Sequence, residues 1–145
     1  MRRILALARR LRRDCPWDRA QDLASFKTCV RKEVREITEA INEGDPAHIA
    51  EEIGDTLWNL AFLVVLCEER RWFGFDTVRD GILAKMVRRH PHVFGDAKAE
   101  TPAEAIALFN RLKAREWKSP PAAARRPTPP PPSGGRRGGG RSPRS

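Results

Sequence analysis

Two long segments with helical periodicity, separated by Gly44-Asp45-Pro46, constrain this chain more than any other feature. In each segment, apolar residues recur every three or four positions, which places them on one helix face. Glycine favours the end of a helix and proline the start of one, so the tripeptide predicts a tight reversal. We therefore expect an antiparallel hairpin of helices over about residues 20–43 and 47–70. The apolar stripes are Leu23, Phe26, Val30, Val34, Ile37 and Ile41 in the first segment and Ile49, Ile53, Leu57, Leu60 and Val64 in the second.

Three shorter helices are expected around the hairpin, and no run of the sequence reads as a strand. They span residues 2–13, residues 76–89 and a last segment that starts at residue 101 with a capping-box pattern and ends near residue 117. Residues 15–18 should break the first helix, and residues 90–96 should form a loop. The predicted fold class is an all-α helical bundle built on the long hairpin. A small core of this kind is often completed by a second copy, so we expect dimerisation.

The chain divides at about residue 118 into one domain, residues 1–118, and a tail, residues 119–145. The tail holds eight prolines and six arginines but no acidic and no large apolar residue. It cannot bury enough surface to offset the entropy of ordering, so we expect it to be disordered. Of the formal net charge of +9, the tail carries +6 and the domain +3. The basic balance is therefore no sign that the domain binds nucleic acid.

Composition also bears on the compartment. Cys15, Cys29 and Cys67 are widely spaced and form no CxxC motif, which argues against a disulfide scaffold or a zinc site and is typical of a reducing cytoplasm. The longest apolar stretch, residues 57–67, is far shorter than the ~20 residues of a membrane-spanning helix. Residues 4–7 are too short for the core of a signal peptide. We expect a soluble, cytoplasmic protein with no membrane partner.

Two pairs of acidic residues flank the predicted reversal. Glu33 and Glu36, like Glu52 and Asp55, are three residues apart, so each pair lies on one helix face. In an antiparallel hairpin centred on residue 44, Glu36 lies level with Glu52 and Glu33 lies level with Asp55. Four carboxylates at one height repel one another unless a cation lies between them. All-oxygen ligands suit Mg²⁺ or Mn²⁺, so the spacing points to a metal-dependent enzyme acting on phosphates.

The surroundings of these acids indicate partial burial without deciding which cation compensates them. Glu52, Asp55 and Asn59 share a narrow strip of the second helix, bordered by bulky apolar residues. Partly desolvated carboxylates need a partner of opposite charge. That partner is either a metal ion or a basic side chain of the first helix, and the spacing favours neither. The basic candidates are Arg31, Lys32 and Arg35.

Four motifs occur in order along residues 15–95. Residues 15–21 begin CPWD and end in Gln, residues 32–36 read KEVRE, residues 52–55 read EIGD, and residues 85–95 read KMVRRHPHVFG. They are similar to CPWDxxQ, EExxE, ExxD and KxxRRHPHVFG of the MazG family of nucleoside triphosphate pyrophosphohydrolases. The ExxD motif alone would be weak evidence for this family, but the four motifs together, in this order, are specific for it. The resemblance covers nearly all of residues 1–118.

The resemblance implies an all-α fold, a homodimer, and Mg²⁺-dependent hydrolysis of NTPs or dNTPs to nucleoside monophosphate and pyrophosphate, as nucleotide-pool housekeeping. Mn²⁺ is the alternative ion. One of the glutamates, Glu36 in preference to Glu33, would orient or deprotonate the attacking water. By position, the metal ligands would be Glu33, Glu36, Glu52 and Asp55. The substrate-binding residues would be Lys85, Arg88, Arg89, Asn59, Trp17, Gln21, Phe109 and Lys113, the basic ones of the RRHPHVFG block contacting the triphosphate.

The sequence departs from the family pattern at three places. Lys32 replaces the first acid of EExxE, which removes a carboxylate and adds a positive charge beside the predicted site. Asn59 stands where Gln is common, and it can still hydrogen-bond a ligand or water. Phe109 stands where Trp often precedes the aliphatic-Lys pair, so stacking on a base is kept and an indole hydrogen bond is lost.

Several of these residues have a structural alternative. Trp17 could plug the core instead of shaping a base pocket with Gln21, and this alternative is slightly favoured. His90 and His92 are expected to cap and pack rather than bind metal. Arg88 and Arg89 could simply complement the dipole at a helix C-terminus.

A second function from another class also fits the sequence. In this alternative the chain is a helical module with weakened catalytic activity, and Lys32 in place of the family's acidic residue would indicate that loss of activity. Its Arg-rich tail would then bind nucleic acid weakly, or an acidic partner, through salt-sensitive contacts. Loss of pyrophosphate release in Glu52→Ala would separate the two functions.

Overall fold

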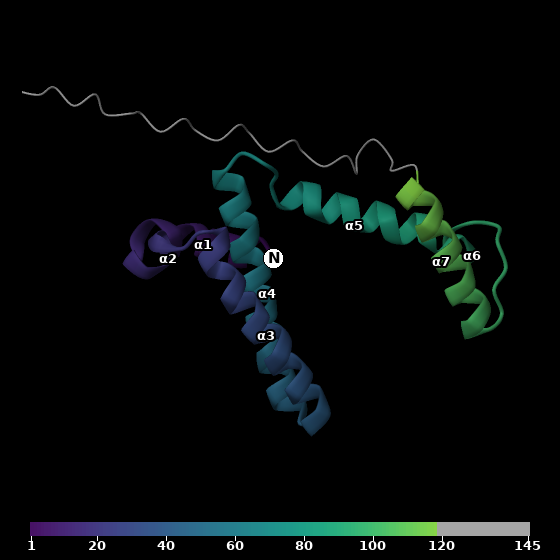
Figure 1. Ribbon diagram of the computed structural model, residues 1–145, viewed down its shortest axis with the longest axis horizontal. Coiled ribbons are helices and arrows are strands. Elements are labelled where there is room, and N and C mark those ends of the chain that lie inside the picture. Colours follow the sequence, from purple (N-terminus) through teal and green to yellow (C-terminus); the bar gives the residue numbers. More distant parts are fainter. Residues whose placement is uncertain (119–145) are drawn as a thin grey trace, which may run out of the picture.

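The computed structural model describes residues 1–118, and the side chains of residues 1–116 (Figure 1). The described part is all-α, as predicted, and no helix in it is both long and apolar enough to cross a membrane. The predicted disordered tail, residues 119–145, lies outside the described residues. The helices are α1 (Arg2–Asp14), α2 (Pro16–Ala20), α3 (Leu23–Glu43), α4 (Pro46–Glu69), α5 (Phe75–Arg89), α6 (Pro91–Phe94) and α7 (Pro102–Lys118).

The predicted hairpin is the α3–α4 pair, and local sequence fixes both of its inner ends. Gly44 ends α3 in the left-handed region, at φ 74° and ψ 15°, where a residue without a Cβ is favoured. Asp45 caps α4 by accepting a hydrogen bond from the amide of Ala47, and Pro46 occupies the first turn. The chain therefore reverses within two residues, and α3 and α4 pack side by side along their length.

The hydrophobic core lies at the end of the hairpin that is far from the Gly44 reversal. Phe26 of α3 stacks on Phe62 of α4 with ring centroids 4.5 Å apart, and both rings are fully buried. Helix α1 covers them with Leu5 and Ala8. Burying two aromatic rings in one cluster removes several hundred Å² of apolar surface from water, at about 25 cal/mol per Å². The core thus fixes how α1, α3 and α4 sit together.

Helices α5, α6 and α7 form a second arm that leads away from the hairpin (Figure 1). Helix α5 packs mainly against α6 and α7, and none of its residues is buried. The arm is held together by Glu116 of α7, which accepts hydrogen bonds from Arg88 at 3.2 Å and from Arg89 at 2.7 Å. Nδ1 of His90 donates to the carbonyl of Met86 at 2.6 Å, in line with its predicted packing role.

Residues 15–18 break the first helix as predicted, since α1 ends at Asp14 with Cys15 as its C-cap, and Pro16 then starts the short helix α2. Two other local predictions are wrong. Helix α3 begins at residue 23 and not at residue 20, because Asp22 and Ser25 form a reciprocal capping box there. Residues 90–96 are not all loop, because Pro91 starts α6.

One expectation about burial is also wrong. Trp17 is 58% exposed, so it does not plug the core. The apolar stripe of α3 is buried at Phe26 but exposed at Val34 and Ile41, at 55% and 60%. One copy of the chain has no element that covers the outer half of this stripe in residues 1–118. Periodicity identifies an apolar face correctly but cannot tell whether the same chain covers it.

Candidate metal centre

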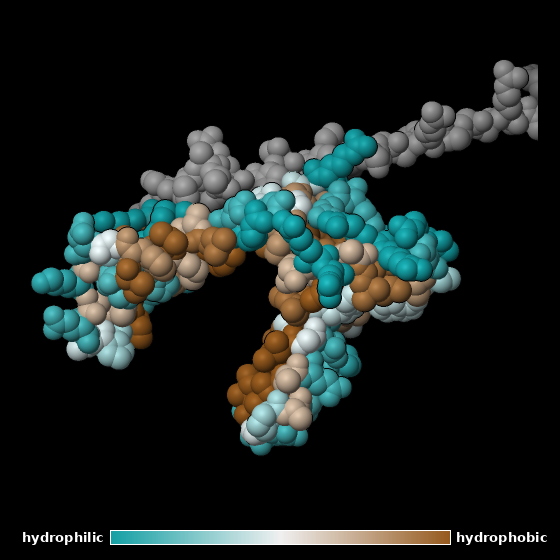
Figure 2. Space-filling model, turned by 180° about the vertical axis from the view of Figure 1, so that it is seen from behind, coloured by the Kyte–Doolittle hydropathy of each residue, from teal (hydrophilic) through white to brown (hydrophobic). Residues whose placement is uncertain are grey.

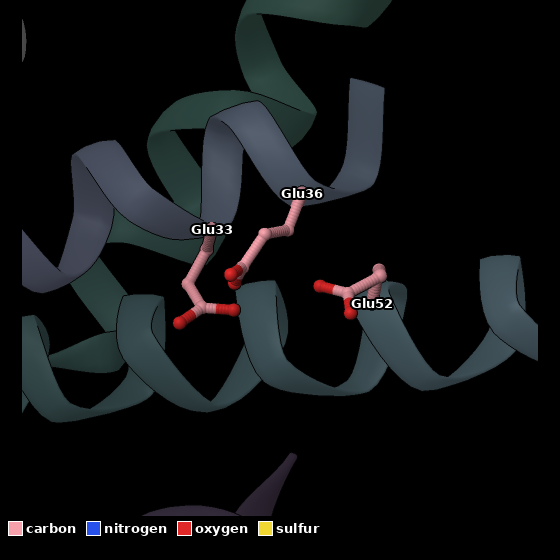
Figure 3. A group of neighbouring side chains, drawn as sticks. All are labelled: Glu33, Glu36 and Glu52. Carbon is pink, nitrogen blue, oxygen red and sulfur yellow. The ribbon is translucent and has the colours of Figure 1, made fainter. Parts of the chain in front are cut away.

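Three of the four predicted acids meet on the hairpin. Glu33 and Glu36 of α3 and Glu52 of α4 each offer a carboxylate oxygen, and these oxygens lie within 4.8 Å of one another (Figure 3). We call these three residues the carboxylate cluster. Asp55, one turn further along α4, is exposed and lies outside the cluster. It is still close enough for its charge to act on Glu33.

The carboxylate cluster is partly desolvated. Glu52 is only 8% exposed, and Glu33 and Glu36 are half-buried. Burial, followed by the charge of Glu36, raises the pKa of Glu33 above its ordinary value. Oε2 of Glu33 and Oε2 of Glu52 are buried and accept no hydrogen bond within the described residues. Buried carboxylate oxygens without a donor are costly, and a divalent cation between them would satisfy both. The residues present therefore fit the predicted metal ion.

Two basic side chains border the cluster. The ammonium of Lys32 lies 2.7 Å from Oε1 and 2.8 Å from Oε2 of Glu36. Nε2 of His48 lies 3.5 Å from Oε1 of Glu52, while its Nδ1 lies 2.7 Å from Glu43. The hydrogen bond to Glu43 is the main reason that the pKa of His48 is raised.

Only one of these two neighbours was anticipated. Lys32 was among the basic candidates on the first helix, whereas Arg35 pairs with Glu39, outside the cluster. The sequence reasoning missed His48, although its four-residue spacing from Glu52 was a usable signal.

Three other predicted substrate-binding residues, Asn59, Gln21 and Trp17, lie on helices α2 to α4 or in their links but outside the carboxylate cluster. Asn59 is buried on α4, 7% exposed, one helical turn beyond Asp55 on the same strip. Gln21 lies in the link between α2 and α3, where its Nε2 donates to the carbonyl of Trp17 at 3.1 Å. The amide of Gln21 is thus held in place, while the ring of Trp17 faces solvent.

The remaining predicted substrate-binding residues, which would contact the triphosphate or stack on the base, belong to the second arm. Lys85, Arg88 and Arg89 are on α5, and Phe109 and Lys113 are on α7. The guanidinium of Arg89 lies 5.2 Å from the centre of the Phe109 ring. In one copy of the chain this arm extends away from the carboxylate cluster, so the structure does not bring the basic and acidic candidates together (Figure 1).

Comparison with known proteins shows which family and which proteins this chain resembles. Residues 21–94 match the MazG nucleotide pyrophosphohydrolase domain, a range that holds the whole carboxylate cluster. The chain is 34% identical over 117 residues to a nucleoside triphosphate pyrophosphohydrolase of Escherichia coli K12, covering 79% of this chain and 44% of that protein. It is 36% identical over 102 residues to the nucleoside triphosphate pyrophosphohydrolase/pyrophosphatase MazG of Thermotoga maritima, covering 70% of this chain and 38% of that protein.

A solved structure shares the fold. The crystal structure of a mazG-related protein from Thermotoga maritima superimposes with a TM-score of 0.67 at 24% identity, covering 79% of this chain and 99% of that one. The chain is also 40% identical over 102 residues to the uncharacterized protein YabN of Bacillus subtilis, covering 70% of this chain and 21% of that protein. The chain spans less than half the length of these curated relatives.

Proposed function

The chain belongs to the MazG nucleotide pyrophosphohydrolase family, and on that premise we propose that it hydrolyses nucleoside triphosphates to nucleoside monophosphate and pyrophosphate. The observation that carries the proposal is the carboxylate cluster, with two buried oxygens that lack a donor within residues 1–118. A structural ion pair would use those oxygens, whereas a metal site leaves them for its ion. Removal of surplus or non-canonical nucleotides is the role that this reaction would serve.

Glu33, Glu36 and Glu52 would hold the ion, with Asp55 as a further ligand from the edge. Mg²⁺, or Mn²⁺ in its place, would neutralise phosphate oxygens and make a bound water more acidic. The attacking water also needs a side chain that orients it and accepts its proton. Both oxygens of Glu36 already bind Lys32, whereas Glu33 keeps one oxygen free of any described donor. We therefore assign the water-orienting role to Glu33, in addition to its ligand role, and a ligand role alone to Glu36.

The basic residues of the second arm would bind the triphosphate from a second copy of the chain. Lys85, Arg88 and Arg89 supply the cationic chemistry for phosphate, but they extend away from the carboxylate cluster of their own chain. A homodimer in which the second arm of one copy meets the hairpin of the other would bring the two sets together.

Exposed apolar surface supports the dimer. Figure 2 shows apolar surface on both arms of the molecule. An apolar groove of about 510 Å³ lies between α4 and the start of α5, and Leu60 and Val78 in its lining are 50% and 41% exposed. Ile82 and Leu83 continue this surface along α5. A surface of this kind is rarely left open to water in a monomer, so a second copy is its proposed occupant.

The test is pyrophosphate release from a panel of NTPs and dNTPs, with Mg²⁺, with Mn²⁺ and with EDTA. Glu52→Gln removes one ligand charge and should lower the rate by roughly 100-fold, since the loss of a group that only supports a metal ligand already costs about 10–100-fold. Glu51→Gln changes an exposed neighbour on the same helix and is the matched control. Release that persists in EDTA, or that Glu52→Gln leaves unchanged, would contradict the proposal.

The weakened helical module remains the second candidate, and one observation favours it. The ammonium of Lys32 already occupies both oxygens of Glu36, as it would in a site that has lost its metal. In that case no nucleotide would be hydrolysed, and truncation after Lys118 would abolish the binding of a nucleic acid or an acidic protein. Turnover that survives this truncation supports the enzyme instead.

A further inference from the structure

Lys32 contacts the carboxylate cluster directly. Its ammonium bridges the two oxygens of Glu36, at 2.7 and 2.8 Å, from one turn earlier on α3. Glu36 also offers a carboxylate oxygen within 4.8 Å of an oxygen of Glu33 and of an oxygen of Glu52, so the ammonium lies beside the whole carboxylate cluster.

The same contact could be an ordinary helix-surface ion pair, but its geometry is a poor one for that purpose. A pair spaced by four residues stabilises a helix more when the acid precedes the base, and here the base comes first. The side chain of Lys32 is also 60% exposed, where an ion pair contributes little to folding. What distinguishes the pair is its acceptor, since Glu36 is one third of the candidate metal centre.

We propose that Lys32 competes with the divalent cation for Glu36 and so lowers the affinity of this chain for its metal. Two cations on one carboxylate repel each other, so the ion must displace the ammonium to use Glu36 fully. The long stem of Lys32 and its exposure allow the ammonium to move into solvent when that happens. The inference rests on the proposed function, because it takes the carboxylate cluster as the metal site.

The size of the effect follows from the charges. A unit charge about 5 Å from a divalent ion in a water-like dielectric changes its binding constant by roughly tenfold. Removal of the ammonium should therefore tighten metal binding by about that factor. Added salt should shrink the difference between the variants, because the lysine is exposed.

The test is titration of the full chain with Mn²⁺ alone, following free Mn²⁺ by electron paramagnetic resonance. Lys32→Met keeps the stem and removes the charge, and it should bind Mn²⁺ roughly tenfold more tightly than the unmodified chain. Lys32→Arg keeps the charge and should bind like the unmodified chain. Lys27→Met, at an exposed lysine of the same helix, is the control for a general loss of positive charge.

The outcomes separate this inference from the function on which it rests. Tighter binding by Lys32→Met, but not by Lys32→Arg or Lys27→Met, supports competition at Glu36. Unchanged or weaker binding by Lys32→Met overturns the inference alone, provided that Glu52→Gln still weakens Mn²⁺ binding. If neither the unmodified chain nor Lys32→Met binds Mn²⁺, that result contradicts both the inference and the proposed metal centre.

Discussion

Arg12 is a partly exposed residue whose substitution should lower the free energy of unfolding substantially. Its side chain is only 13% exposed, and its guanidinium joins α1 to α2, to the link between α2 and α3, and to α4. Nε and Nη2 donate to Glu69 at the end of α4, at 2.8 and 2.6 Å. Nη1 donates to the carbonyl of Gln21 at 2.9 Å and also to the carbonyl of Asp18. Substitution Arg12→Met keeps a stem of similar length and removes every one of these donors.

The cost can be worked from these contacts. The carboxylate of Glu69 is 41% exposed, so water replaces the guanidinium and the pair contributes only about 0.5–1 kcal/mol. The two carbonyls are partly buried, and each loses a charged donor at about 1–1.5 kcal/mol. Together the substitution should lower the free energy of unfolding by about 3 kcal/mol. For a domain of this size that is a fall in Tm of about 10 °C.

Urea unfolding followed by circular dichroism, at one fixed protein concentration, measures the change. Arg13→Met is the matched control, because Arg13 is 69% exposed and pairs only with its neighbour Asp14 among the described residues; it should change stability by less than about 0.5 kcal/mol. The hydrogen bond from Arg12 also lowers the pKa of Glu69. The stability from this pair is therefore complete above the ordinary pKa of 4.5 and is lost as pH falls through the lowered value. A loss below about 1 kcal/mol in Arg12→Met, or one equal to the control, would refute this role for the partly buried guanidinium.

Three further predictions test other parts of the molecule. Glu33→Gln should raise the stability of the metal-free protein at pH 7, because a raised pKa means that the ionised form is disfavoured in the folded protein. The gain should shrink as pH falls through the raised pKa towards 4.5, and urea unfolding in EDTA at several pH values would detect it. Asp22→Ala removes the acceptor of the capping box and should cost about 1 kcal/mol in the same assay, while an unchanged value would mean that the cap contributes nothing. Leu60→Lys, in the apolar groove, should convert a dimer to a monomer in light scattering, and a dimer that survives would exclude this groove from the interface.

The hairpin could be predicted from sequence because its determinants are local. Gly44 and Pro46 act on their own backbone, and the apolar period of each segment reports directly on a helix face. The start of α3 was misplaced because the reciprocal bonds of Asp22 and Ser25 outweigh the helical pattern that continues before them. What covers an apolar face is not local, and this is why periodicity placed Val34 on the apolar face without showing that it is exposed in one copy of the chain.

The sequence could predict which residues of the candidate site share a helix face, but it could not predict the positions and contacts of their side chains. Spacing brought Glu33, Glu36 and Glu52 together correctly, since backbone register decides which residues are level in an antiparallel pair. It could not show that Asp55 lies at the exposed edge, or that Lys32 bonds both oxygens of Glu36. Those outcomes depend on side-chain rotamers and on the tilt between two helices, which periodicity does not encode.

Anomalous diffraction at the manganese edge, from crystals of the full chain grown with Mn²⁺, would decide whether the carboxylate cluster is a metal centre. We predict an anomalous peak between the helices of the hairpin, bonded to oxygens of Glu33, Glu36 and Glu52 and absent in Glu52→Gln crystals. A cluster without a peak at saturating Mn²⁺, with Lys32 still bonded to Glu36, would contradict the metal-dependent function proposed for this chain.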